Sequence, residues 1–169
     1  SQEGTTATVT ECLLILYSYH HKNTEKIASA LAHVLDAEIC SPQQVGPEVL
    51  QGYVLIGFGS GIYSGEHHRS LLDLADRLPK LSHRRAFLFS TCGVPAFALK
   101  GGHMDEYVDE MHARLKEKLR SKGYRIVGEF TCAGWNTISF LKLFGGINKG
   151  RPNAQDLERA QAVARDVKR

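Results

Sequence analysis

The sequence lacks the features that mark several large classes of protein. Its four cysteines lie far apart among 169 residues and form no CxxC pair, which suits a reducing compartment better than a disulfide-rich secreted domain. No apolar run approaches the ~20 residues that a membrane span requires. Residues 1–10 are polar and lack the basic start of a signal peptide, so we interpret them as a loose leader. These absences predict a cytoplasmic protein without a membrane span.

A strong charge of either sign is also lacking. Lys and Arg number 21 against 18 Asp and Glu, which gives a net charge of +3. The basic residues are not gathered with aromatic residues into a stripe, so we exclude nucleic-acid binding. The hydrophobic fraction of 43% and the charged fraction of 23% are typical of a globular domain. At this length we expect one domain, over residues 1–169.

Apolar runs alternate with amphipathic segments along the chain. The runs predict five β-strands, at residues 12–18, 37–40, 53–60, 84–91 and 124–132. The amphipathic segments predict helices at 23–37, 65–79 and 104–122, and from Asn153 onward. The connection at 41–52 contains two prolines and two glycines, which predict a short or irregular helix. Strands that alternate with helices favour a parallel sheet covered on both faces.

The starts of the helices carry capping and polar residues. Asn23 or Thr24 is the expected N-cap of the first helix, and Asn153 is the expected N-cap of the last one. His67 and His68 are expected in the first turn of the helix at 65–79.

The loop after the first strand, SYHHKNT, has the composition of an anion site. In an open α/β sheet, ligands bind beyond the carboxyl ends of the strands. This loop runs into a helix N-terminus, where free backbone N–H groups favour negative charge. Donors and positive charge come from Ser18, Tyr19, His20, His21, Lys22, Asn23 and Thr24. The alternative is an N-cap followed by solvated polar residues.

The segment LLILYSYHHKNTEKIASAL resembles the phosphate loop of the flavodoxin family. An apolar strand ends in an aromatic residue, six polar or small residues close on Asn-Thr, and an amphipathic helix follows. The IGFGSGIYSG loop, the alternation of five strands and the final helix after NKGRPN are similar too, so the resemblance spans residues 12 to 168. It implies a flavodoxin-like three-layer α/β sandwich. The implied sheet has five parallel strands in the order 2-1-3-4-5, and the implied cofactor is non-covalent FMN.

The resemblance also implies which residues hold the cofactor. The first loop would cradle the phosphate, although Tyr19, His20, His21 and Lys22 stand where the family typically has hydroxyl residues and a glycine. Two further loops would flank the isoalloxazine ring. They contribute Ser60, Gly61, Ile62, Tyr63, Ser64 and Gly65, and Ser90, Thr91, Cys92 and Gly93.

Individual roles around the ring follow from the same resemblance. Tyr63 is our first choice for stacking on the ring, with Phe97 or Trp135 as alternatives. Gly59, Gly61 and Gly65 would let the backbone approach the ring and adopt positive φ. Either Gly61 or Gly65 would allow the peptide near the flavin N5 to reorient on reduction. The segment Ser90–Gly93 would give backbone hydrogen bonds to the pyrimidine edge.

A metal site is the main rival interpretation of the histidines. The candidates near one sheet edge are His20, His21, His67, His68, His103 and Cys92. Their spacing matches no zinc motif, so we expect no metal. The GFGSGIYSG stretch also lacks the spacing of a dinucleotide fingerprint and of a nucleophile elbow.

These observations favour an electron-transfer protein in which the flavin is the redox centre and the protein supplies no catalytic acid, base or nucleophile. The alternatives are an FMN-dependent NAD(P)H or quinone oxidoreductase of the same fold, and an anion-binding module without flavin. Typical flavodoxins are strongly acidic, whereas this chain carries +3. Its charge favours an acidic redox partner or an anionic substrate. It also favours a less negative midpoint potential for the hydroquinone couple.

The histidine pair predicts a pH-dependent affinity for FMN. A phosphate dianion beside His20 and His21 favours their charged forms and raises their pKa values. We therefore expect FMN to bind more weakly as the pH rises above neutrality. Titrations of FMN between about pH 6 and pH 9 measure the effect, and a constant affinity over that range would contradict it.

Overall fold

A computed structural model describes residues 12–18, 22–93, 104–134 and 149–168 of the chain. The expected leader at 1–10 lies outside these residues. The elements are β1 (Cys12–Tyr17), α1 (Asn23–Leu35), β2 (Glu38–Cys40), the 3-10 helix η1 (Val49–Gly52), β3 (Leu55–Tyr63), β4 (Glu66–His67), α2 (Arg69–Arg77), β5 (Arg84–Cys92), α3 (Met104–Ser121), β6 (Tyr124–Ala133) and α4 (Ala154–Lys168).

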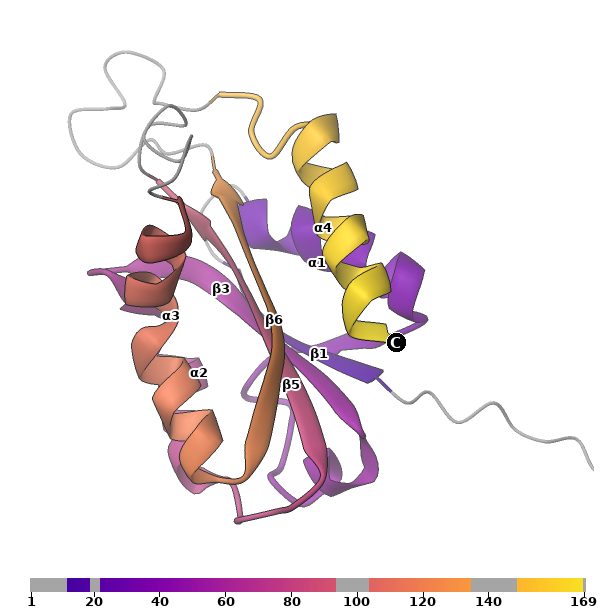
Figure 1. The fold of residues 1–169 in the computed structure, drawn as a ribbon, viewed down its shortest axis with the longest axis vertical. Helices are drawn as coiled ribbons and strands as arrows, with labels where there is room; N and C mark the ends of the chain where they lie inside the picture. Colours follow the sequence, from indigo (N-terminus) through magenta and orange to yellow (C-terminus); the bar gives the residue numbers. More distant parts are fainter. Residues whose placement is uncertain (1–11, 19–21, 94–103, 135–148, 169) are drawn as a thin grey trace, which may run out of the picture.

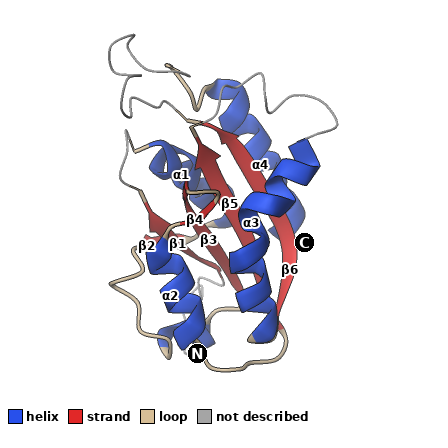
Figure 2. Cartoon of the chain, turned by 90° about the vertical axis from the view of Figure 1, so that its left-hand side faces the viewer, coloured by secondary structure: helices blue, strands red, loops and turns tan. Residues whose placement is uncertain are grey.

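Five strands pair in parallel to form one sheet, in the order β2-β1-β3-β5-β6. Counted without the short β4, this is the predicted order 2-1-3-4-5. Figures 1 and 2 show α1 and α4 on one face of the sheet and α2 and α3 on the other. The fold class is therefore the expected three-layer α/β sandwich. The irregular connection predicted at 41–52 contains only η1.

Each face of the sheet packs against its own pair of helices. Leu13 and Ile15 of β1 join the core under α2 and α3, while Leu14 joins the core under α1 and α4. Successive side chains of a strand point to opposite faces. A strand buried on both faces therefore reads as the continuous apolar run seen in the sequence.

Gly57 and Gly59 of β3 leave room for two phenylalanine rings. A Cβ atom at Gly59 would lie 2.0 Å from the ring of Phe89, and one at Gly57 would lie 2.5 Å from the ring of Phe87. Both rings are fully buried. We expected Gly59 to let the backbone approach a flavin, but the structure gives it a packing role in the core.

The expectation that His67 and His68 lie in a first helical turn is wrong. Ser64 and Gly65 have φ values of 51° and 80° and form a two-residue turn between β3 and β4, as favoured in a tight hairpin. His67 therefore lies in a strand. His68 is the N-cap of α2, and its Nδ1 accepts a hydrogen bond from the Ser70 backbone N–H at 3.1 Å.

The caps of α1 and α4 also refine the predictions. The N-cap of α1 is Lys22, with φ 52°, one residue before Asn23 and two before Thr24, the two expected caps. Thr24 instead forms a hydrogen bond with Thr91 of β5. Asn153 caps α4 as predicted: its Oδ1 accepts from the Asp156 N–H at 3.0 Å, and its own N–H donates to Asp156 Oδ2 at 2.9 Å. This is a reciprocal capping box with an aspartate in the third position.

The structure also tests the expectations about cysteines and membrane spans. All four cysteines are free thiols, and Cys12, Cys92 and Cys132 are buried. In the part of the chain that the structure describes, no helix has both the length and the apolar character needed to cross a membrane.

We expect His67 to make the folded protein less stable at acidic pH. Its side chain is 1% exposed, and its Nε2 lies 3.1 Å from the Phe89 carbonyl oxygen. Burial, helped by nearby His112, lowers the pKa of His67 from an ordinary 6.5 to about 3. Between these two values the unfolded chain binds a proton that the folded chain does not, so stability falls as the pH falls through this window.

We expect His67→Gln to remove this contribution, because glutamine does not titrate and can still donate to Phe89. Urea unfolding at about pH 6, 5 and 4 should show the wild type losing up to about 1.4 kcal/mol per pH unit more than the variant. Parallel pH dependences in the two proteins would contradict a neutral, buried His67.

Candidate functional site

The carboxyl ends of the central strands bring the predicted cofactor residues side by side. The parallel register places Tyr17 opposite Ser60, and Ser60 opposite Ser90. Gly61 is likewise opposite Thr91. Residues that are 43 positions (Tyr17 and Ser60) and 30 positions (Ser60 and Ser90) apart in the sequence therefore lie side by side in one row at one edge of the sheet. The N-terminus of α1, which begins at Asn23, also lies at this edge, as does the half-buried Ser18 that follows β1.

The N-terminus of α1 is joined to the end of β5 by a buried hydrogen bond. Thr24 Oγ1 lies 2.8 Å from Thr91 Oγ1, and both side chains are buried. Asn23 is also buried, and a Cβ atom at Gly134, just after β6, would lie 2.6 Å from its Nδ2. Asn23 and Thr24 therefore lock the helix start against the strand ends.

The helix start keeps the character of an anion site. Lys22 is exposed, and its side chain makes no capping hydrogen bond. The first turn of a helix has N–H groups without intrahelical acceptors, and they favour an anion. Tyr19, His20 and His21 lie outside the described residues, so their predicted phosphate contacts stay predictions.

The side chains at the ends of β3 and β5 are engaged within the protein. Ser60 Oγ donates to the Gly61 carbonyl and accepts from the His68 N–H at 3.0 Å. Ser90 Oγ bonds to His112 and Thr131. Ser60, Ser90 and Thr91 are each less than 5% exposed. These side chains therefore hold the strand ends, and the predicted contacts of Ser90–Gly93 with a ligand would come from the backbone.

Cys92 and Ile62 belong to a small apolar cluster at the same edge. Cys92 is 3% exposed and packs with Met111 and Ala133, and the half-buried Ile62 packs against them. The Cys92 thiol donates weakly to the Cys132 carbonyl oxygen, with Sγ at 3.7 Å. The cluster gives this edge an apolar floor. Gly93 follows it and is half-buried.

Three aromatic rings gather beyond β1 and β3. The rings of Tyr17 and His68 are stacked, with centroids 3.6 Å apart and an interplanar angle of 8°. Tyr63 meets His68 edge-on at 5.0 Å and Tyr17 at 6.2 Å. Burial lowers the pKa of His68, with Asp73 opposing it, which favours a neutral ring. Tyr63 was expected to stack on the flavin ring, and it does lie in this group. His68 was not expected here, because residues 65–79 were predicted as one helix, and Tyr17 was not selected because it reads as the last residue of a buried strand. Phe97 and Trp135 lie outside the described residues.

Gly61 at the end of β3 and Gly65 in the following turn have different roles. Gly65 has a φ of 80°, and a Cβ atom there would meet nothing within 4 Å. A Cβ atom at Gly61 would lie 3.4 Å from the ring of Tyr63, so Gly61 keeps space beside that ring. Among the predicted site glycines, only Gly65 has a φ recorded in the left-handed region. Ser64 and Gly65 are both exposed at the turn.

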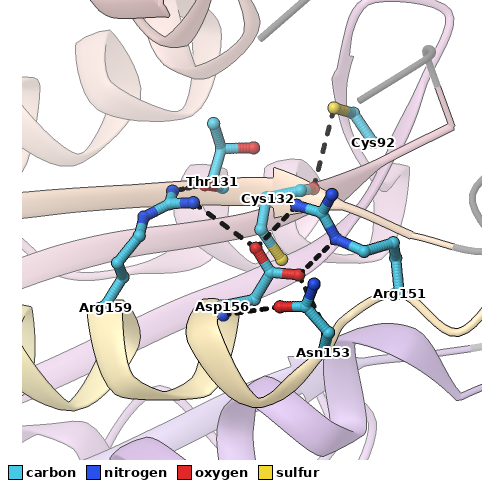
Figure 3. Close-up of polar contacts among 7 residues, drawn as sticks. All are labelled: Cys92, Thr131, Cys132, Arg151, Asn153, Asp156 and Arg159. Atoms are coloured by element: carbon cyan, nitrogen blue, oxygen red, sulfur yellow. Dashed lines mark hydrogen bonds and ion pairs between the residues drawn. The ribbon is translucent and has the colours of Figure 1, made fainter. Parts of the chain in front are cut away.

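Asp156 is a buried carboxylate at the start of α4, and its two arginine partners were not predicted from the sequence. Asp156 is 1% exposed and accepts from Arg151 Nε at 2.6 Å and Arg151 Nη2 at 2.7 Å. Arg159 lies 3.4 Å away on the other side and also donates to the Thr131 carbonyl at 3.1 Å. Figure 3 shows the two guanidinium groups flanking Asp156 beside Cys132. The hydrogen bonds that Arg151 donates to Asp156 raise the pKa of Arg151, and the cluster fixes α4 to the end of β6.

The histidines that the structure describes do not assemble a metal site. His67 is buried in β4, and His68 caps α2. Among the described residues, no three His, Cys, Asp or Glu side chains are grouped so that they could hold a metal ion. His20, His21 and His103 lie outside these residues.

Comparisons with known proteins identify the family of this chain. Residues 14–133 match the model of a flavodoxin domain. An uncharacterized protein of Methanocaldococcus jannaschii is 45% identical over 156 residues, which cover 91% of this chain and 96% of that protein.

Solved structures with a similar fold share little sequence with this chain. Oxidised flavodoxin 2 from Bacillus cereus has a TM-score of 0.63 at 20% identity, covering 91% of this chain and 95% of its own. The apo form of an NADH:FMN oxidoreductase has a TM-score of 0.62 at 19% identity, covering 94% and 89%. At this identity the likeness concerns the fold. The domain match, the sheet order and the row of strand ends agree, and the chain belongs to the flavodoxin family.

Proposed function

We propose that the chain binds FMN non-covalently at the carboxyl ends of β1, β3 and β5 and uses it to transfer electrons. The main support is the α1 N-terminus, which the Thr24–Thr91 bond of 2.8 Å joins to the end of β5. A helix N-terminus favours a phosphate, and the row of strand ends beside it is where ligands bind in this class of sheet.

The residues present fit FMN chemically. Lys22 and the first turn of α1 offer positive charge and N–H donors to the phosphate. Tyr17, Tyr63 and His68 offer flat aromatic rings near the expected position of the isoalloxazine. None of the seventeen predicted cofactor residues is Asp or Glu, so a dianion meets no carboxylate among them.

When bound, FMN supplies the redox chemistry itself. The chain's own residues bind the phosphate, orient the ring and hold the strand ends. The hydroxyl groups of Ser60, Ser90 and Thr91 are held in internal hydrogen bonds. We assign them to positioning and assign no proton transfer to them.

The net charge of +3 supports an acidic redox partner or an anionic substrate, because long-range steering follows the sign of the surface charge. The pair of Arg151 with the buried Asp156 is neutral as a unit, so the excess positive charge is carried by other side chains. The second candidate is an FMN-dependent NAD(P)H or quinone oxidoreductase. It is favoured by the similar fold of the NADH:FMN oxidoreductase.

The position of the phosphate predicts the effect of one charge reversal. Lys22→Glu places a carboxylate at the N-cap of α1 and should weaken FMN binding about tenfold or more, the size of a lost charge-assisted hydrogen bond. Riboflavin, which lacks the phosphate, should be affected much less. Isothermal titration calorimetry measures both ligands.

Lys26→Glu is the matched control, because Lys26 is an exposed lysine of the same helix one turn further on. It should change FMN affinity by less than threefold or so, given salt screening. Equal losses in both variants would indicate a general charge effect and would contradict a phosphate at the helix start.

Stepwise anaerobic reduction of the FMN-loaded protein separates a carrier from a reductase. For a one-electron carrier we expect visible spectra that pass through a distinct, long-lived one-electron-reduced form. Direct bleaching to the fully reduced form, with rapid turnover of NAD(P)H or a quinone, would favour the reductase. Absence of flavin binding would contradict both.

A further inference from the structure

His68 is fixed at the edge of the sheet where Tyr17, Tyr63 and His68 form the aromatic group. Its backbone N–H donates to Ser60 Oγ at 3.0 Å, and Ser60 belongs to the row of strand ends. Its ring is stacked on the ring of Tyr17, with centroids 3.6 Å apart and an interplanar angle of 8°. Its Nδ1 is bonded to Ser70 at the start of α2. The backbone, one ring face and one ring nitrogen of His68 are therefore all held in place.

The cap of α2 determines which ring nitrogen of His68 carries a proton. Nδ1 accepts from the Ser70 backbone N–H at 3.1 Å. A backbone N–H can only donate, and at the second position of a helix it has no intrahelical acceptor. Nδ1 must therefore be bare. The Ser70 hydroxyl group, 2.8 Å from Nδ1, does not alter this, because a hydroxyl group can donate as well as accept.

The ring of His68 is neutral. A charged imidazole carries a proton on both nitrogens, which the cap of α2 excludes. Burial lowers the pKa of His68, and the charge of Asp73 opposes this only in part. Asp73 is itself exposed and lies 3.8 Å from Arg69 of the same helix, where solvent screens its charge. With Nδ1 bare and the ring neutral, the single ring proton is on Nε2.

The N–H group at Nε2 makes no hydrogen bond inside the protein. Nε2 is at the tip of the side chain, and the hydrogen bonds of His68 with described residues involve only its backbone N–H and Nδ1. Four buried side-chain atoms in the described ranges lack a partner, and Nε2 of His68 is not one of them. Nε2 is therefore accessible, and its proton is available to a ligand.

Histidine is an unusual residue for this cap. Asn, Asp, Ser and Thr are the preferred N-caps, and each would accept from the Ser70 N–H without adding a ring. Histidine adds a flat ring on Tyr17 and a second nitrogen that donates. Capping alone does not account for these two properties, so they indicate a role in binding.

We propose that His68 determines specificity for the bound ring: it is held as the neutral Nε2–H form and donates a hydrogen bond to an acceptor at the edge of a planar ligand. This inference rests on the proposed FMN function, because the isoalloxazine ring carries carbonyl oxygens and bare nitrogens that accept such a bond. Loss of the Nε2 proton would leave an imidazolate anion. His68 therefore binds the ring and transfers no proton.

The protonation state is tested on the protein without flavin. Long-range proton–nitrogen NMR of the 15N-labelled protein reports each imidazole nitrogen, and His68→Asn identifies the His68 signals by their loss. We expect a protonated Nε2 and a bare Nδ1 at about pH 7. A proton on Nδ1, alone or together with one on Nε2, would overturn the proposal.

Two substitutions separate the cap from the donor. His68→Asn keeps a preferred N-cap but removes the donor at Nε2. His68→Gln loses the cap but places an amide N–H near the position of Nε2. Both variants lose the stack on Tyr17, so His68→Gln should melt about 2 to 4 °C below His68→Asn, the effect of one lost cap. Equal melting temperatures would contradict the capping role and with it the bare Nδ1.

Calorimetric titration of both variants with FMN tests the donor. His68→Gln should bind FMN about threefold to tenfold more tightly than His68→Asn, the contribution of one hydrogen bond. Riboflavin should show the same ratio, because the bond is to the ring and not to the phosphate. The less stable variant is thus expected to bind more tightly, which general destabilisation does not produce. Equal affinities of the two variants would overturn the donor role.

His33→Asn is the matched control, because it makes the same substitution at an exposed position of α1. It should leave the affinities for FMN and riboflavin unchanged. Failure of the wild type to bind FMN would refute the proposed function and the ligand contact together, and the NMR result would still decide the protonation of His68.

Discussion

Parallel pairing of β1, β3 and β5 is the constraint on which the rest of the structure depends. It aligns Tyr17, Ser60 and Ser90 in one row, so residues distant in sequence reach the same edge. The pairing is possible because both faces of these strands are buried under helices, as parallel sheets require. Gly57 and Gly59 serve this packing by admitting the rings of two phenylalanines.

Buried polar groups then fix the ends that the sheet brings together. Thr24 bonds to Thr91 on one face, while Ser90 bonds to His112 on the other. At the end of β6, Asp156 holds α4 through two arginines (Figure 3). Unpaired, such groups would cost several kcal/mol each in a low-dielectric interior. Their mutual satisfaction fixes the positions of these strand and helix ends, and a site whose groups are already positioned loses less entropy when a ligand binds.

Much of the fold was predictable, because buried strands read as apolar runs and helices as amphipathic ones. The strand order came from the family resemblance of SYHHKNT and GSGIYSG. The two-residue strand β4 was missed, since two residues show no periodicity, and His67 was misplaced with it. The partners of His112 and Asp156 could not be predicted either. Their contacts depend on how α3 and α4 pack on the sheet, and the sequence spacing of Ser90 and Glu129 carries no trace of it.

The central claim is that FMN binds across the ends of β1, β3 and β5. Amide chemical-shift mapping during titration of the 15N-labelled protein with FMN tests it most directly. The account predicts the largest shifts at Lys22–Thr24, Gly61–Gly65 and Thr91–Gly93. A groove of about 550 Å³ along β6, lined by Val108, Phe130 and Val163 among others, is one of several hollows in the described part of the chain and lies away from this row of strand ends. Shifts concentrated there, or no shifts at all, would contradict the account.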